Sequence, residues 1–183
     1  MPAFIETGRL RLRPAHLGDA EALFALFNNW NVVRWLSSPQ WPNTLQMTQA
    51  FLARVTGADP PEDYRVIEME GMVVGGIGMR HDPVSRLQSG SGLQVGYWLG
   101  EPFWGKGVMS EAVRALVSDV FSDKAVPALY SGIFEGNHAS LRIQEKLGFV
   151  VDGKAMMFST PWQKELPHLN TVLTRENFEK NKK

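Results

Sequence analysis

The sequence predicts one α/β (α+β) domain, in which a mixed and mostly antiparallel sheet carries helices on its faces. Segments with the two-residue alternation of strands outnumber segments with the helical period, and the two kinds interleave along the chain. The expected order is one strand, a group of helices, three strands, a helix, a strand, a helix and two strands. A length of 183 residues suits a single domain, which we expect to span residues 1–183 with its core at about 8–175.

The first third of the chain predicts one strand followed by helices. Arg9–Arg13 alternates arginine with leucine, which is the pattern of a half-buried strand, and Pro14 ends it. Apolar residues at helical spacing follow in three segments that are separated by loops rich in proline or polar residues: Asp19–Asn28, Asn31–Leu36 and Thr44–Thr56.

The middle of the chain predicts three strands and the clearest helix. Tyr64–Glu70 and Met72–Arg80 flank Gly71 as a hairpin, and Leu93–Leu99 forms another strand. Gly107–Phe121 carries one continuous apolar stripe at i, i+4 spacing, which predicts an amphipathic helix.

The last third predicts a strand, a helix and two further strands, in the order Ala128–Phe134, Asn137–Leu147, Phe149–Met157 and Leu169–Leu173. Asn137 suits the N-cap of the helix, and Gly148 suits the left-handed position after its last turn. The charged segment Glu179–Lys183 predicts a frayed tail.

Composition excludes several classes of function. A formal net charge of zero gives no reason to expect nucleic acid or an anionic membrane as partner. The chain has no cysteine, which excludes disulfides, thiolate metal sites and a cysteine nucleophile, and its four histidines are too scattered to predict a metal site. Met1–Arg9 lacks the pattern of a signal peptide, and no apolar stretch approaches the ~20 residues that span a bilayer. We therefore expect a cytoplasmic protein.

A glycine-rich turn before the long helix predicts a phosphate site. Gly105 and Gly107 remove the Cβ atoms that would keep backbone N–H groups from a ligand, and the helix start adds unpaired N–H donors. Lys106 adds a full positive charge. The turn also fits the start of a P-loop, but Gly107 stands where that motif needs a hydroxyl for Mg²⁺, so an NTPase is disfavoured. A tight turn with a solvent-facing lysine is the structural alternative.

Together these motifs resemble the GNAT N-acetyltransferases, and most of all their RimJ/RimL branch of ribosomal-protein-alanine acetyltransferases. The resemblance rests on the order and spacing of five pieces: Gly96-Tyr97-Trp98-Leu99, Trp104-Gly105-Lys106-Gly107, Glu111-Ala112, Asn137-x-x-Ser140 and Glu145-Lys146-Leu147-Gly148-Phe149. The segments 6–13 and 173–176 also resemble that branch, so the similarity covers nearly the whole chain.

The resemblance implies an acetyl-CoA-dependent N-acetyltransferase whose sheet is splayed between the strands that end near Leu99 and Phe134. The pantetheine arm of acetyl-CoA would lie in the gap, the diphosphate would rest on the glycine turn and the first helical residues, and two further residues would face the arm near the sulfur. The implied cofactor-binding residues are Tyr97, Trp98, Leu99, Gly105, Lys106, Gly107, Val108, Met109, Ser110, Asn137 and Ser140. The family needs no metal, and a homodimer is compatible with it.

Three positions depart from the family pattern. Met109 replaces a small residue and is expected to crowd the helix start, which leaves phosphate contacts to the backbone. Gln144 replaces a tyrosine that many members place seven residues after the asparagine, so no phenol can protonate the thiolate from there. Gln94 replaces a glutamate, and an amide cannot act as a base. Other acids and histidines are best explained as solvated strand, turn or surface residues: Glu68, Glu70, His81, Asp82, His138 and His168.

The predicted chemistry is direct attack of a neutral primary amine on the thioester in a ternary complex. An α-amine is ~10–17% neutral at pH 7, whereas a lysine side chain is only ~0.04% neutral. The N-terminal α-amine of a protein, such as a ribosomal protein, is therefore the favoured acceptor. A strand N–H near Trp98 or Leu99 would hold the oxyanion, and Ser140 would hydrogen-bond the departing sulfur. A small-molecule amine such as a polyamine, amino sugar or drug, another acyl-CoA donor, and a non-catalytic acyl-CoA sensor remain alternatives.

Overall fold

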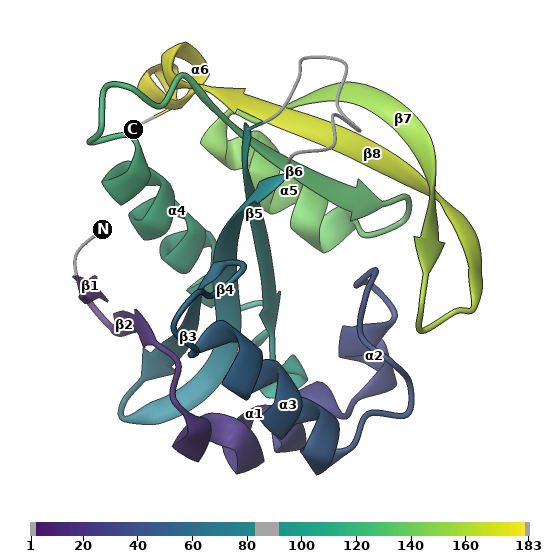
Figure 1. Ribbon diagram of the computed structural model, residues 1–183. Coiled ribbons are helices and arrows are strands. Elements are labelled where there is room, and N and C mark those ends of the chain that lie inside the picture. Colours follow the sequence, from purple (N-terminus) through teal and green to yellow (C-terminus); the bar gives the residue numbers. More distant parts are fainter. Residues whose placement is uncertain (1–2, 83–91, 182–183) are drawn as a thin grey trace.

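A computed structural model describes residues 3–82 and 92–181 and shows one open sheet with helices on both faces (Figure 1). The strands follow the order β1-β2-β3-β4-β5-β6-β8-β7 across the sheet. Their bounds are β1 (Ile5–Glu6), β2 (Leu10–Pro14), β3 (Asp63–Met69), β4 (Met72–Asp82), β5 (Gly92–Leu99), β6 (Ala128–Phe134), β7 (Val150–Ser159) and β8 (Lys164–Thr174). Neighbouring strands are antiparallel except for β5 and β6, which run parallel. The predicted mixed and mostly antiparallel sheet is confirmed.

The helices up to residue 147 occupy the positions that the apolar periodicity predicts, and one further short helix follows the last strand. They are α1 (Ala20–Phe27), α2 (Trp30–Val33), α3 (Leu45–Val55), α4 (Val108–Val120), α5 (His138–Leu147) and α6 (Arg175–Lys180), and two 3₁₀ turns lie at Leu17–Asp19 and Glu101–Phe103. No helix among residues 3–82 and 92–181 is long and apolar enough to cross a membrane.

The two faces of the sheet carry separate hydrophobic clusters. The larger cluster packs α4 and the end of α5 against inward residues of β2–β6 and β8, with Leu12, Ile77 and Leu116 at its centre. The smaller cluster packs α1 and α3 against the opposite face, where Leu52 and Val66 are fully buried. Successive side chains of a central strand such as β5 therefore point to opposite faces of the sheet, one covered by α4 and α5 and the other by α1 and α3.

Strands β5 and β6 form a fork. They pair only at Leu93 with Leu129 and at Gln94 with Tyr130, and beyond these rungs they separate (Figure 1). The splay expected between the strands that end near Leu99 and Phe134 is therefore present. Backbone groups of β5 past Gln94 face a gap instead of a neighbouring strand.

The C-terminal end differs from the sequence prediction. Glu179 and Lys180 belong to α6 and not to a frayed tail, because Phe178 is fully buried against Phe121 and anchors this short helix. Residues 182–183 lie outside the described residues. Strand β8 is also longer than the predicted Leu169–Leu173, since the alternation continues back to Lys164 through the pairing with β7.

Candidate active site

A cavity of about 1020 Å³ opens at the fork and is lined from both faces of the sheet. Of the eleven residues predicted to bind the cofactor, every one except Lys106 lines this cavity. The lining residues of that set are Tyr97, Trp98, Leu99, Gly105, Gly107, Val108, Met109, Ser110, Asn137 and Ser140. The fold thus brings β5, the glycine turn and the starts of α4 and α5 to one place.

The glycine turn presents bare backbone to the cavity. Gly105 and Gly107 both adopt left-handed conformations, with φ of 73° and 74°, and Gly107 is the N-cap of α4 without a side-chain cap. A Cβ at Gly105 would meet no atom within 4 Å. Met109 packs into the larger hydrophobic cluster with 5% exposure and also lines the cavity, so the expected crowding of the helix start stays a prediction. The free N–H groups of the first turn are therefore open to an anion.

Charged side chains brace this turn from outside. Lys106 donates from Nζ to the carbonyl oxygen of Pro102 at 2.9 Å, so its charge lies beside the turn and not in the cavity lining. Arg9 donates from Nη2 to the carbonyl oxygen of Lys106 at 2.9 Å and from Nε to Glu111 at 2.6 Å. Partial burial opposes ionisation of Glu111, but hydrogen bonds from Thr7 and Arg9 outweigh it and hold the pKa of Glu111 below its ordinary value.

The open edge of β5 offers backbone donors to the fork. The carbonyl oxygen of Val95 accepts a hydrogen bond from Ser131 Oγ at 3.0 Å, and that of Leu99 accepts one from Trp104 Nε1 at 2.8 Å. Both carbonyl groups lie on the edge of β5 that faces the fork, where β5 and β6 are no longer paired. Because alternate residues of a strand share an edge, the N–H groups of Tyr97 and Leu99 face the fork, and the intervening amides face β4. Of the N–H groups near the expected oxyanion donor, those of Tyr97 and Leu99 therefore face the fork and that of Trp98 does not.

Ser140 meets a phenol that the sequence did not predict. Asn137 caps α5 by accepting a hydrogen bond from the backbone N–H of Ser140 at 3.2 Å, as its N-cap position predicted. The hydroxyl of Ser140 lies 2.8 Å from the hydroxyl of Tyr97, which reaches across the fork from β5. Burial raises the pKa of Tyr97 above its ordinary value, against hydrogen bonds that lower it. The pair therefore stays protonated at neutral pH.

Gln144 has a structural role at the fork. It is 1% exposed, donates from Nε2 to Ser131 Oγ at 2.9 Å and accepts from Thr171 Oγ1 at 2.7 Å. Ser131 in turn donates to Val95, one residue past the last rung between β5 and β6. This chain of hydrogen bonds joins α5, β6, β8 and β5 where the sheet divides.

The comparison with known families decides the identity of this site. The family description "Acetyltransferase (GNAT) domain" matches residues 9–150, which is most of the chain and includes the fork, the glycine turn and both helix starts. The chain belongs to the GNAT acetyltransferase family. It is therefore an acetyl-CoA-dependent N-acetyltransferase, and the open glycine turn and the forked sheet fit coenzyme A.

Relatives of this GNAT enzyme agree in sequence and in fold. The uncharacterized N-acetyltransferase YoaA of Bacillus subtilis is 30% identical over 155 residues, which cover 81% of this chain and 84% of that protein. The microcin C7 self-immunity acetyltransferase MccE, solved with acetyl-CoA and AMP, has a TM-score of 0.79 at 19% identity, with 95% and 97% of the two chains covered. The ribosomal-protein-S5-alanine acetyltransferase of Vibrio fischeri has a TM-score of 0.77 at 18% identity, with 97% and 99% covered.

Relative to the GNAT pattern, the α1/α3 face lacks a carboxylate on β5. Gln94 occupies that position, and its Oε1 accepts a hydrogen bond from Arg80 Nε at 2.9 Å. Of the other acids and histidines considered as a base, Glu68, Glu70 and His81 lie outside the cavity lining. Glu68 pairs with Arg13 at 3.5 Å, Glu70 sits in a turn with φ of 52°, and His81 is exposed. The side chain of Asp82 lies outside the described residues.

His168 is buried, which corrects the expectation of a surface residue. Its side chain packs over Gly132 of β6 and against Phe134, and the residue is 5% exposed. Its Nδ1 lies 3.1 Å from Asn170 Oδ1, and both residues line the cavity. The alternation of β8 showed only that residues 169–173 form a strand, and it gave no signal that His168 closes the cavity wall. Among the described residues, no three or more His, Asp or Glu side chains gather as a metal site.

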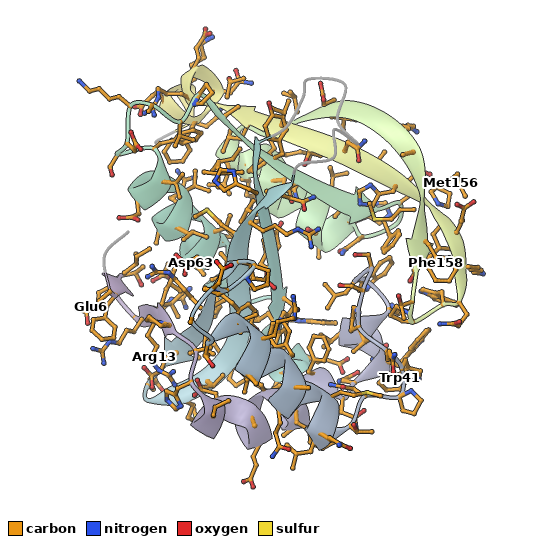
Figure 2. The ribbon with its side chains drawn as sticks, in the orientation of Figure 1. Glu6, Arg13, Trp41, Asp63, Met156 and Phe158 are labelled. Atoms are coloured by element: carbon orange, nitrogen blue, oxygen red, sulfur yellow. The ribbon has the colours of Figure 1, made fainter. Side chains whose placement is uncertain are left out.

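The hairpin of β7 and β8 closes one end of the cavity. Its tip is held against the loop after α2 by two hydrogen bonds, from Trp162 Nε1 to the carbonyl oxygen of Arg34 at 3.0 Å and from Thr160 N to that of Ser37 at 2.8 Å. Figure 2 shows Met156 and Phe158 along this hairpin and Trp41 below it, and all three side chains are largely or partly exposed. Ser37 lines the cavity, so this contact shapes its mouth.

Proposed function

We propose that this enzyme acetylates the N-terminal α-amine of a protein, such as a ribosomal protein. The observation that carries the proposal is the state of Gln94, an amide whose oxygen already accepts a hydrogen bond from Arg80. β5 then offers no base to an incoming ammonium, which favours an acceptor that is already partly neutral. At pH 7, ~10–17% of an α-amine is neutral, whereas only ~0.04% of a lysine side chain is neutral. The fold neighbour described as a ribosomal-protein-S5-alanine acetyltransferase supports the same acceptor class.

The reaction runs by direct attack in a ternary complex. The amine nitrogen forms a bond to the thioester carbonyl carbon, and the oxyanion accepts hydrogen bonds from the N–H groups of Tyr97 and Leu99 on the fork edge. The carbon–sulfur bond then breaks. The thiolate of coenzyme A receives a proton through Ser140, whose hydroxyl contacts the phenol of Tyr97.

Two matched peptides test the acceptor class. One has a free α-amine and no lysine, and the other has a blocked N-terminus and one lysine; thiol release from acetyl-CoA measures both rates. We expect the α-amine peptide to react on the order of 10² times faster at neutral pH, in proportion to the neutral fractions. Equal rates would overturn the proposal.

The same assay separates the alternatives. Turnover of a polyamine or amino sugar without turnover of either peptide would assign a small-molecule acceptor. Binding of coenzyme A without thiol release from any amine would assign a sensor. Faster reaction of succinyl-CoA than of acetyl-CoA with the preferred amine would assign a different donor.

A further inference from the structure

A strip of bare backbone crosses the α1/α3 face of the sheet beside the fork. Gly78 of β4 and Gly96 of β5 lie directly opposite each other. A Cβ at Gly96 would meet no atom within 4 Å, so the space above this residue is open. We call this strip, Gly78 and Gly96 with the space above them, the glycine trough. Gly96 precedes Tyr97, so the trough ends beside the N–H groups that the proposed function assigns to the oxyanion.

Side chains on both sides confine the glycine trough. On one side, Trp98 Nε1 donates to Tyr64 Oη at 3.1 Å, and the Tyr64 hydroxyl lies over Gly76 so closely that a Cβ there would collide with it. On the other side, Arg80 and Gln94 pair across β4 and β5. The floor between these walls has no side chains, which suits the slim end of an extended chain.

Glu62 places a carboxylate above this floor. It directly precedes β3, and its side chain is 21% exposed. Its Oε1 lies 3.8 Å from Arg54 Nη2, whereas its Oε2 lies 3.1 Å from the position of a Cβ on Gly78. One oxygen therefore faces an arginine and the other faces the trough. Among the described residues that line the cavity, Glu62 is the only one with a carboxylate.

We propose that Glu62 binds the acceptor amine in the glycine trough and accepts the proton that the nitrogen loses as the amide forms. The inference rests on the proposed function only in requiring an amine at the end of a slim chain. The nitrogen lone pair forms the bond to the carbonyl carbon, one N–H proton passes to the Glu62 carboxylate directly or through one water, and the carbon–sulfur bond breaks. The thiolate takes a proton from Ser140 as Ser140 takes one from Tyr97, and solvent later restores Tyr97 and Glu62.

Two substitutions test the assignment, each with a matched control. Glu62→Gln keeps the shape and removes the proton acceptor, so we expect kcat to fall on the order of 10²-fold, with the KM for acetyl-CoA changed less than about twofold. Glu62→Asp retains a carboxylate and should recover part of the rate. Gly96→Ala fills the trough without a clash and should raise the KM for the amine about tenfold or more, again without change for acetyl-CoA. Glu145→Gln and Gly8→Ala, at exposed positions outside the cavity, should behave as wild type.

The outcomes distinguish an error in this role from an error in the acceptor class. The comparison uses whichever amine the wild-type enzyme acetylates best. If that amine is not a protein N-terminus but Glu62→Gln still loses rate, the proposed acceptor is wrong and the role of Glu62 stands. If Glu62→Gln keeps a wild-type kcat, the role is overturned whatever the amine. Loss of acetyl-CoA affinity together with rate in Glu62→Gln would also overturn it, because that result indicates general damage to the fold.

Discussion

At the scale of single residues, the contact between Ser140 and Tyr97 supports the proposed route of a proton to the leaving thiolate. A serine hydroxyl is too weak an acid to donate its proton without replacement. A phenol, with an ordinary pKa near 10, is a far stronger acid and lies 2.8 Å from the serine oxygen. Burial raises the pKa of Tyr97, so the phenol keeps its proton at neutral and mildly alkaline pH. The pair can pass one proton toward the sulfur and still be restored from solvent.

The variant Tyr97→Phe tests this pair. It removes the hydroxyl and keeps the ring, so we expect kcat to fall on the order of 10²-fold while the KM for acetyl-CoA stays within about twofold. Steady-state rates of thiol release measure both constants. The variant Ser140→Ala should lower kcat in the same way, and the double variant should lose little more than either single one. An unchanged kcat in Tyr97→Phe would remove the phenol from the chemistry.

Residue-scale prediction from the sequence succeeded where a motif has fixed local spacing. Asn137 and Ser140 lie three residues apart at one helix start, so their cap could be predicted. The contact of Tyr97 with Ser140 joins positions 43 residues apart, and no local pattern encodes it. The same holds for Glu62, which appeared in the sequence as one more polar residue before a strand. Its position above Gly78 depends on the register of β3 and β4.

At the scale of elements, the fork depends on a side chain that replaces backbone pairing. Gln144 of α5 connects Ser131 of β6 with Thr171 of β8, and Ser131 bonds the first unpaired carbonyl of β5. Gln144 thus orients the Ser131 hydroxyl that connects β6 to β5 just beyond Gln94. At the position where the family resemblance implies a tyrosine, this chain therefore has a side chain that joins β6 to β8.

The variant Gln144→Leu should therefore lower stability. It removes the acceptor of the buried Thr171 hydroxyl and the donor to Ser131 Oγ, which keeps its bond to Val95, so we expect the free energy of unfolding to fall by about 1–3 kcal/mol. Denaturant titration measures the change. Adding Thr171→Val to Gln144→Leu removes one stranded hydroxyl and should recover part of the loss. Full stability in the single variant would show that the link contributes nothing.

A second element-scale link joins the turn between β1 and β2 to the start of α4. Arg9 bonds Glu111 and the carbonyl oxygen of Lys106, and it fixes the glycine turn from outside. Because the folded pKa of Glu111 is lowered from 4.5, its ionised form stabilises the fold above about pH 4.5, and this contribution is lost as the pH falls through the folded pKa.

The variant Glu111→Gln tests that link through its pH dependence. We expect it to be less stable than wild type at neutral pH, and the difference should shrink as the pH falls below about 4.5. Thermal unfolding of both proteins at neutral pH and below about pH 4.5 measures the difference in stability, and the exposed Glu145→Gln variant is the control. A difference that stays constant with pH would show that the carboxylate charge is not the cause.

Element prediction worked best where apolar periodicity was long and failed where packing is set from elsewhere. The stripe of α4 and the alternation of β3 to β6 predicted those elements to within a few residues. The charged segment of α6 gave no such period, and its one anchor, Phe178, is buried by contact with Phe121 of α4's C-cap. The start of β8 contains Pro167 and polar residues, and its strand form follows from pairing with β7.

At the scale of the whole molecule, the sheet separates the two surfaces on which we propose that acetyl-CoA and the amine bind. The glycine turn, Tyr97 and Ser140 face the side of α4 and α5, whereas the glycine trough, Glu62 and Tyr64 face the side of α1 and α3. The fork is the place where the two sides meet. Acetyl-CoA and the amine can therefore be bound at the same time and react at the fork, without binding one after the other at a single site.

This arrangement predicts the kinetic mechanism. The chain has no cysteine to carry an acyl group, and the two reactants reach the fork from opposite faces, so both must be bound before the acetyl group moves. Initial rates measured over a grid of acetyl-CoA and amine concentrations should give intersecting lines in double-reciprocal plots. Intact mass spectrometry after incubation with acetyl-CoA alone should show no acetylated protein. Parallel lines together with an enzyme one acetyl group heavier would show a covalent intermediate on another side chain, because a ternary complex produces neither result.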